Sequence, residues 1–367
     1  MKFNVEVLRD NVPIGTLKLI SGDVKYNSES RIKRAANIIV AADELNSNKG
    51  IRKNDEYLYP ASDLYPSENL FLKSQFAFSS ELNLNKMKDR IRIMIDKQSI
   101  GKFMIVSSPK KINENQKTYE FELYDESYKI DEASLSNRMY FPEGTLYLSA
   151  IKTILTNYDY PDVINDDSAA VLSTDREWEI GENVLDIVNE LLKEINFNSF
   201  FLDENGVVRL TKKDKKIVPN HVYKEGNLSK IRPDINISED VYKIPNVFIG
   251  VVSRPEAEPL IYRRVNDNPD SIVSTIGRGF EIVRVENLND IANEEELKNY
   301  IDDIYLQSIQ TVEKIEFSSA IESGHTFQEL IQIDTRNISG IYKEIAWNID
   351  LSPSGKMTHT AERKSYQ

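Results

Sequence analysis

The sequence predicts an α+β fold that is mainly β, and three observations support this. The first third contains short runs in which apolar and polar residues alternate, as in 89–95, and this is the pattern of half-buried strands. The last third, from Pro245 to Thr358, contains further strand-like runs around one capped helix. Between these parts, apolar residues recur at helical spacing. The 367 residues exceed what one hydrophobic core usually serves, so we expect two or three domains.

Residues 1–135 are predicted to form the first β unit. Phe3, Val5 and Val7 alternate with polar residues, and a turn is expected at 12–15. The segment 31–42 is ambiguous between helix and strand, and its β-branched residues favour a strand. Further strands are expected at 89–95, 102–106 and 117–125. Several short strands with turns between them are typical of a barrel or sandwich.

Residues 46–80 are predicted to be a loop-rich insertion in this unit, because they contain Pro60 and Pro66. Two interpretations of its aromatic residues stay open: they contact a neighbouring surface, or they cover one edge of the core. The tyrosines concerned are Tyr57, Tyr59 and Tyr65.

Residues 136–235 are predicted to form a small α+β domain. Thr145 can cap a helix near 145–157, and Gly181 precedes a more strongly amphipathic helix near 182–195. Asn205 and Gly206 stand between two alternating runs, which predicts a β-hairpin near 198–211.

Residues 236–367 are predicted to form a second β unit with an inserted helix near 293–311. Asn293 as N-cap and Glu296 three residues later form a capping-box pattern at the start of that helix. The pair Gly277 and Gly279 lacks the third glycine and the following helix of a dinucleotide loop, so we expect a tight bend or bulge in a strand.

Composition excludes several classes of protein. No run approaches the roughly 20 apolar residues of a membrane helix, so we expect synthesis in the cytoplasm and no membrane insertion. The absence of cysteine excludes disulfides, thiolate nucleophiles and cysteine zinc sites. The net charge of -13 argues against stable nucleic-acid binding. The basic runs at 31–34 and 212–216 lack interleaved aromatic residues for base stacking.

No residue is predicted to be catalytic, cofactor-binding or metal-binding, and no cofactor is expected. His221, His325 and His359 are far apart in sequence and match no ligand motif, so we expect three ordinary polar residues. No GxSxG elbow supports a Ser-His-Asp triad. Trp178 lies among acidic residues as in a sugar site, but packing beneath the helix that follows Gly181 is the favoured interpretation.

The chain resembles the baseplate or tail hub proteins of contractile phage tails, prophage tails and R-type bacteriocin particles. The resemblance covers nearly the whole chain and rests on the order and spacing of several segments. These are Val12-Pro13-Ile14-Gly15, Asp89-Arg90-Ile91-Arg92-Ile93, Gly101-Lys102-Phe103, Ile105-Val106-Ser107, Glu122-Leu123-Tyr124-Asp125, Glu143-Gly144-Thr145, residues 178–185, residues 202–206 and Pro245-Asn246-Val247.

The resemblance implies a homotrimer in which each subunit contributes two β-barrel domains, here 1–135 and 236–367, flanking the α+β domain. Six barrels around a threefold axis would match a sixfold tail tube to a threefold spike. The expected partners are the tube, the spike, a LysM-type adapter and a tape-measure protein, in an assembled phage tail or tail-like particle. One branch of the family carries a lytic domain after the hub on the same chain, and since the sequence departs from that branch, we expect any wall-degrading activity to belong to another subunit.

We therefore expect a structural protein and not an enzyme. Two alternatives stay open. The first is a peptidoglycan hydrolase that uses paired carboxylates, since 59 Asp and Glu residues always place some pairs close together. The second is a tail module that binds carbohydrate or a receptor through exposed aromatic residues. The sequence leaves open whether the particle is a phage or a headless bacteriocin.

Overall fold

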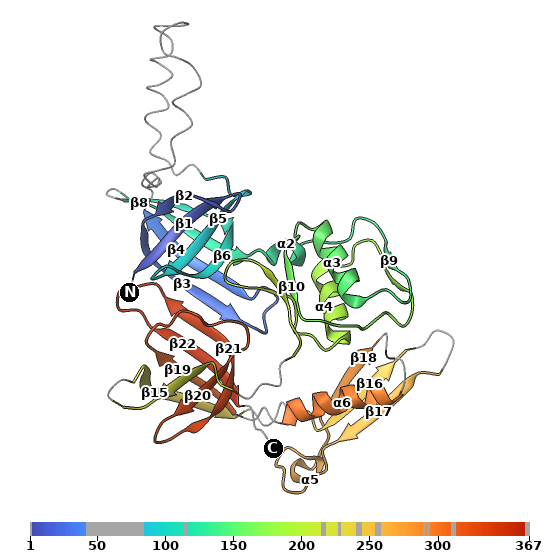
Figure 1. Cartoon of the computed structure of the whole chain (residues 1–367). Helices are drawn as coiled ribbons and strands as arrows, with labels where there is room; N and C mark the ends of the chain where they lie inside the picture. The colour runs from blue at the N-terminus through green and yellow to red at the C-terminus, as the bar shows by residue number, and fades with distance from the viewer. Residues whose placement is uncertain are drawn as a thin grey trace, which may run out of the picture.

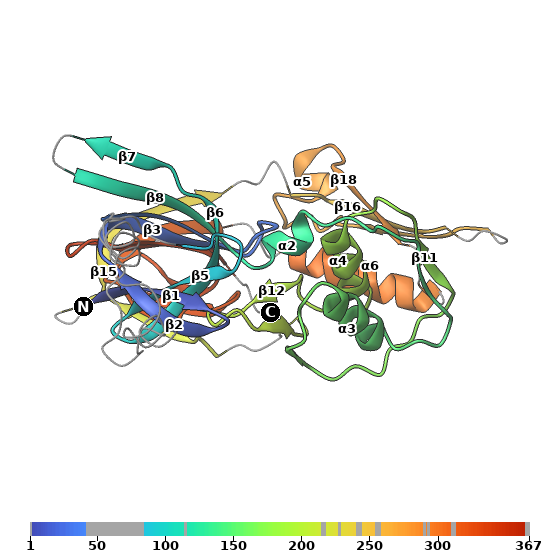
Figure 2. The same ribbon diagram turned by 90° about the horizontal axis from the view of Figure 1, so that it is seen from above.

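The computed structural model describes residues 2–41, 84–113, 116–213, 218–226, 229–239, 244–253, 258–288, 291, 294–309 and 313–363. Strands from the two ends of the chain stack into one column, blue to cyan above and red below in Figure 1. Seen from above, the helices α3, α4 and α6 lie to one side of this column (Figure 2). The predicted class, α+β and mainly β, is confirmed.

The upper part of the column is built from the N-terminal strands. These are β1 (Phe3–Arg9), β2 (Val12–Leu17), β3 (Leu19–Asn27), β4 (Arg34–Ala41), β5 (Asp89–Ile95), β6 (Gln98–Ser107), β7 (Lys110–Asn113) and β8 (Gln116–Asp125). The ambiguous segment at 31–42 is thus a strand over β4, as its β-branched residues favoured. Val5 and Val7 of β1 are fully buried, which confirms the alternation read from the sequence. The tyrosine-rich insertion at 46–80 lies outside the described residues.

The expected turn at Val12 to Gly15 was wrong, because these residues lie in β2. The chain reverses direction before β2, at Asp10 and Asn11. Their φ angles of 50° and 64° are those of a tight hairpin turn. Pro13 is tolerated because β2 pairs with β1 alone among the described strands.

The lower part of the column comes from the second half of the chain. Its strands are β14 (His221–Lys224), β15 (Ile231–Glu239), β19 (Glu313–Ser319), β20 (Leu330–Asp334), β21 (Ser339–Asp350) and β22 (Met357–Arg363). Strand β21 pairs antiparallel with β3, with Trp347 opposite Tyr26 and Ile349 opposite Val24. The strands of the upper and lower parts therefore form one branched sheet whose main path runs from β15 to β2.

The same pairing joins the two ends of the chain in one hydrophobic core. Val24, Tyr26 and Phe103 from the first half pack with Trp347 and Met357 from the second. The rings of Tyr26 and Trp347 stack with centroids 5.5 Å apart and an interplanar angle of 23°. Both side chains are buried.

The middle of the chain forms a helical unit beside the column. Its elements are α2 (Tyr128–Asp131), β9 (Met139–Phe141), α3 (Tyr147–Asn157), β10 (Val163–Asn165), β11 (Arg176–Trp178), α4 (Val184–Glu194), β12 (Phe201–Leu202) and β13 (Val208–Leu210). Asn183 caps α4, where its side chain accepts a hydrogen bond from the backbone of Asp186. Thr145 does not cap α3, because its hydroxyl donates to the carbonyl of Pro142 instead.

A third unit separates β15 from β19 in sequence. It contains β16 (Val247–Val252), β17 (Leu260–Val265), α5 (Thr275–Arg278), β18 (Val283–Leu288) and α6 (Glu294–Ile309). Helix α6 lies within the segment 293–311, and the proposed N-cap Asn293 falls outside the described residues. A Cβ on Gly250 would lie 2.6 Å from a methyl group of Leu297, so this glycine lets α6 approach β16 closely.

Charged side chains connect these units. The buried Arg34 of β4 donates from Nη1 to the carbonyl of Leu202 in β12 at 2.6 Å. Its backbone N–H donates to the buried carboxylate of Asp125 at 2.8 Å. Lys193 of α4 donates to Glu286 of β18 at 2.6 Å, so the helical unit contacts both the column and the third unit.

Trp347→Ala is expected to lower the free energy of unfolding by about 3–5 kcal/mol, because it empties the core at the β3–β21 contact. Chemical denaturation followed by circular dichroism measures the change. Ile261→Ala is the control: its side chain is 59% exposed, so the change should stay within about 0.5 kcal/mol. Equal effects from the two substitutions would contradict this account of the contact.

The buried Asp89 of β5 predicts a pH-dependent stability. Burial works to raise the pKa of its carboxyl group, but hydrogen bonds from Arg9 and from the backbone of Asn85 outweigh it, so the pKa is lowered. The charged form thus contributes stability above the unfolded-state pKa of about 3.9, and this is lost as the pH falls through the lower folded-state pKa.

Asp89→Asn should therefore lower the unfolding free energy at pH 7 by roughly 1–3 kcal/mol. The difference from the unsubstituted protein should shrink as the pH falls below about 4. Urea denaturation at a series of pH values tests this, and a difference independent of pH would refute the assignment of charge.

Candidate functional site: a buried histidine–carboxylate cluster

The three histidines of the chain, expected to be unrelated polar residues, lie together in the lower part of the column. His221 belongs to β14, His325 to the loop between β19 and β20, and His359 to β22. The ring centroids of His221 and His325 are 3.8 Å apart, and those of His325 and His359 are 5.2 Å apart. No local pattern in the sequence signals this proximity, because each histidine comes from a different segment of the sheet.

A β-bulge lies directly after Glu344, the carboxylate that contacts two of these histidines. The pairing of β21 with β22 passes from Glu344 opposite Ala361 to Ala346 opposite Thr360, so Ile345 is an extra residue in β21. A bulge breaks the alternation of side chains along a strand and redirects one of them. Glu344 and Ile345 are accordingly both buried, although they are neighbours.

The Glu344 carboxylate contacts one nitrogen of each ring. Oε1 lies 2.5 Å from Nδ1 of His359, and Oε2 lies 2.7 Å from Nδ1 of His325. The side chains of His359 and Glu344 are 0% exposed, and that of His325 is 1% exposed. Burial works to raise the pKa of Glu344, but its contacts with His325 and His359 outweigh burial, so the pKa is lowered and the carboxylate is charged.

The outer nitrogens of these rings have partners as well. Nε2 of His359 lies 2.8 Å from Oγ of Ser319, and Nε2 of His325 lies 3.1 Å from the hydroxyl oxygen of Tyr223. Ser319 and Tyr223 are fully buried. Burial lowers the pKa of His359, since a charged imidazolium is costly to remove from water.

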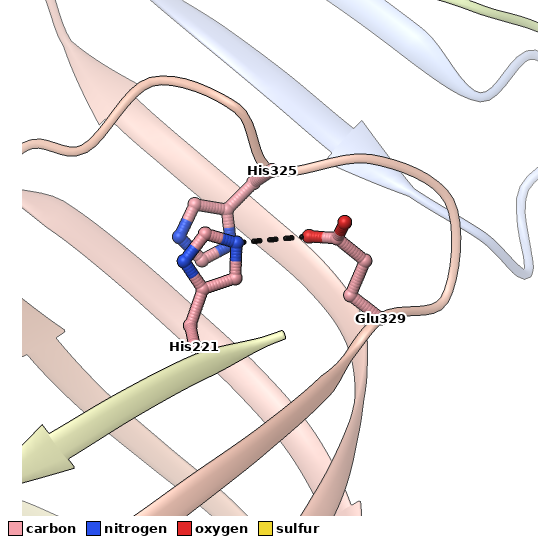
Figure 3. A group of neighbouring side chains, drawn as sticks. All are labelled: His221, His325 and Glu329. Carbon is pink, nitrogen blue, oxygen red and sulfur yellow. Dashed lines mark hydrogen bonds and ion pairs between the residues drawn. The ribbon is translucent and has the colours of Figure 1, made fainter. Parts of the chain in front are cut away.

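His221 and Glu329 form a second, less buried pair beside this centre (Figure 3). Nε2 of His221 lies 3.1 Å from Oε2 of Glu329, and this hydrogen bond raises the pKa of His221. Glu329 also accepts hydrogen bonds from the backbone and hydroxyl of Thr326. The ring of His221 lies nearly parallel to that of His325, with an interplanar angle of 8°.

A cavity of about 310 Å³ lies next to His325. Strand β6 and the turn after β12 contribute to its wall, as do the loop at 322–326 and β21. The column and the helical unit therefore meet at the cavity. The cavity thus borders the histidine cluster at His325.

The other candidate segments have structural roles. Trp178 is 4% exposed and packs in the core that contains α4, which confirms the packing interpretation. The expected bend or bulge at Gly277 to Gly279 was wrong: Gly277 lies in α5, and Gly279 ends that helix with a φ of 80°. Ser274 caps the helix, where its hydroxyl oxygen accepts from the backbone N–H of Gly277, and a serine at this position is a capping signal in the sequence.

The described helices include none that is long and apolar enough to cross a membrane. Comparison with family models finds no match, and comparison with curated proteins finds none either. Comparison with solved structures does find matches.

A tail protein from Neisseria meningitidis MC58 has a TM-score of 0.68 at 10% identity, and the match covers 100% of this chain and 97% of that one. The 43 kDa tail protein of prophage MuSo2 from Shewanella oneidensis has a TM-score of 0.65 at 9% identity, with 98% of each chain covered. The c3393 protein of E. coli, a type VI secretion component, has a TM-score of 0.53 at 10% identity, with 100% of this chain and 77% of that one covered. The chain thus has the fold of these tail proteins.

Glu344→Gln is expected to lower the free energy of unfolding by about 3–5 kcal/mol, because it removes a buried charge that serves two histidines. Glu329→Gln is the matched control and should cost only about 1 kcal/mol, since an amide oxygen still accepts from His221 or Thr326. Thermal and chemical unfolding of both variants provides the comparison. Similar losses would show that Glu344 does not hold the cluster together.

Proposed function

We propose that this chain is a structural baseplate hub of a contractile tail-like particle, a trimeric adapter between a sixfold tail tube and a threefold spike. The observation that carries the proposal is the fold match to a tail protein over 100% of this chain and 97% of the other. A match of this extent includes every unit and their order along the chain. The fold is shared at 10% identity, so the role itself is inferred.

The free strand edges of the column support assembly into a ring. Among the strands that the structure describes, β2 pairs only with β1, and β15 pairs only with β19. These two strands are therefore edges of the sheet. Each edge carries an exposed apolar side chain, Val12 at 58% and Ile237 at 50%. Unpaired edges are templates for pairing with another chain, and contact between two different edges builds a ring when the rotation closes.

The domain limits predicted from the sequence belong to this proposal. Residues 1–135 and 236–367 would supply the two β units of each subunit, and 136–235 the domain between them. The tube, the spike, a LysM-type adapter and a tape-measure protein are the proposed partners. Three chains of -13 each would carry -39, a charge that repels DNA passing through a central channel.

Neither alternative function gains support from the described residues. The acidic residues next to Trp178 in sequence have structural partners: Asp175 accepts a hydrogen bond from the backbone of Glu143, and Glu177 and Glu179 form ion pairs with Arg138. Trp178 is buried and is not available to bind a sugar. Tyr57 and Tyr59, the other residues of the alternative binding surface, lie outside the described residues.

The purified chain is expected to form a trimer in native mass spectrometry and to be present in purified tail-like particles. Val12→Lys and Ile237→Lys should each shift the trimer towards monomer, because each places a charge on a proposed contact edge. Ile272→Lys should leave the trimer intact, since this side chain is 67% exposed and lies outside both edge strands. A stable monomer that is absent from purified particles would rule out the hub role.

A further inference from the structure

The three-stranded sheet of the third unit has two different faces. Its strand order is β17-β16-β18, and helix α6 lies along one side of it (Figure 1). On that side Phe248 of β16 packs in one cluster with Leu297 and Ile301 of the helix. Side chains alternate along a strand, so Ile249 and Val251 of β16 belong to the opposite face.

The strand register identifies the other residues of this second face. Ile249 lies opposite Arg263 of β17 and Val285 of β18, and Val251 lies opposite Ile261. The face so defined is called the open face, and it consists of Arg263 and six apolar side chains. The six are Ile249, Val251, Ile261, Val265, Val283 and Val285.

Solvent reaches the open face. Ile261, Val285 and Val283 are 59%, 52% and 48% exposed, and the other three apolar side chains are half-buried. In a soluble protein the solvated face of a sheet usually carries polar residues. A contiguous exposed apolar surface instead marks a site of interaction.

Arg263 gives the open face a positive charge midway along β17. Its guanidinium lies 2.7 Å from the carboxylate of Glu281, and both side chains are exposed. Ion pairs at the surface contribute little to stability, because water and salt screen them. Arg263 can therefore exchange Glu281 for a carboxylate of the segment that covers the face.

The size of the open face suits one segment of chain. Each strand has six residues, and with strands about 4.8 Å apart and a rise of about 3.3 Å per residue the face measures roughly 14 by 20 Å. This projected area of about 300 Å² is well below the roughly 800 Å² that each partner contributes to a typical stable interface. Two copies joined by their open faces alone would therefore associate weakly.

The insertion between β4 and β5 contains a stretch whose composition complements the open face. Residues 55–71, which lie outside the described part of the chain, read DEYLYPASDLYPSENLF. This stretch has three tyrosines, three leucines and one phenylalanine, together with four carboxylates and no lysine or arginine. Residues before proline favour extended conformations, which suit a segment lying on a sheet. The stretch is thus apolar, acidic and long enough to cover the face.

We propose that the open face is a docking surface for residues 55–71 of a neighbouring copy of this chain. Aromatic and leucine side chains of the segment pack on the apolar residues of the face, and Asp63 or Glu68 pairs with Arg263. Burial of apolar area drives this contact, and the charge pair makes it selective for an acidic segment.

The neighbouring copy is the proposed source because of where the segment starts and ends. Strands β4 and β5, which bracket it, belong to the upper part of the column, whereas the third unit lies beside the lower part (Figure 1). This inference rests on the proposed trimer, which supplies the neighbour. The docking adds to the contacts at the edges β2 and β15, so its loss leaves a trimer.

Cysteine labelling tests the contact, since the chain contains no cysteine of its own. In the full-length trimer, Val285→Cys should react with a maleimide about 10-fold more slowly than Ile180→Cys, because a covered thiol reacts only when the contact opens. Ile180 is the control, since it is exposed and lies in the helical unit. Arg263→Glu should restore the rate, and so should the pair Asp63→Lys and Glu68→Lys.

Equal rates for Val285→Cys and Ile180→Cys in the trimer would overturn the docking and leave the proposed function intact, because native mass spectrometry tests the trimer separately. Protection that appears only in assembled particles would also overturn it, since another tail protein would then cover the face. Both side chains are exposed, so neither substitution is expected to disturb folding.

Co-expression of two differently tagged chains identifies the copy that supplies the segment. One chain carries Val285→Cys and a Gly/Ser linker in place of residues 46–80, and the other keeps the segment but carries Val285→Lys. The thiol should be protected in trimers that carry both tags. Protection in the full-length chain but not in the mixed trimer would place the segment on the sheet of its own chain and overturn the assignment to a neighbour.

A fluorescein-labelled peptide of residues 55–71 tests the recognition without the trimer. It should bind the chain that has the linker in place of residues 46–80, as measured by fluorescence anisotropy. Arg263→Glu in that chain should weaken binding by about 10-fold or more, since it replaces an attraction with a repulsion. Absence of binding, or binding unchanged by Arg263→Glu, would overturn the match between segment and face.

Discussion

The pairing of β3 with β21 is the contact on which the rest of the structure depends. It joins residues 23–27 to residues 346–350, so nearly the whole chain lies between the two partners. Closing such a long loop costs conformational entropy, and the buried stack of Tyr26 on Trp347 offsets part of that cost. The result is one core shared by both ends of the chain, around which the intervening units are arranged.

The histidine cluster depends on the same strand. Trp347 lies three residues after Glu344 in β21, and the bulge at Ile345 lies between them. The strand thus presents a tryptophan to the shared core and a carboxylate to His325 and His359. A buried charge of this kind is stable only with well-placed partners, so the polar centre makes the position of β21 relative to β22 specific.

A column whose outermost strands, among those described, each pair on one side, together with two side units, suits the proposed role in assembly. The links from Arg34 to Leu202 and from Lys193 to Glu286 hold the helical unit in a defined position. Such links let one chain present several surfaces in fixed relative orientation. A symmetric particle requires this of a subunit that contacts several different neighbours.

The sequence by itself determined the fold class and most local elements, because alternation, helical spacing and Asn-Gly turns depend on neighbouring residues. Strands β1 and β5, helix α4 and the hairpin of β12 and β13 follow from such patterns. The first turn was predicted at 12–15, around Pro13, and was wrong. The turn lies at Asp10 and Asn11, which adopt positive φ, and these two residues are a weaker turn signal in a sequence than a proline. Tertiary structure alone decided that His325, His359 and Glu344 meet, since residues from separate strands and a loop come together through sheet register and a bulge, which no local pattern encodes.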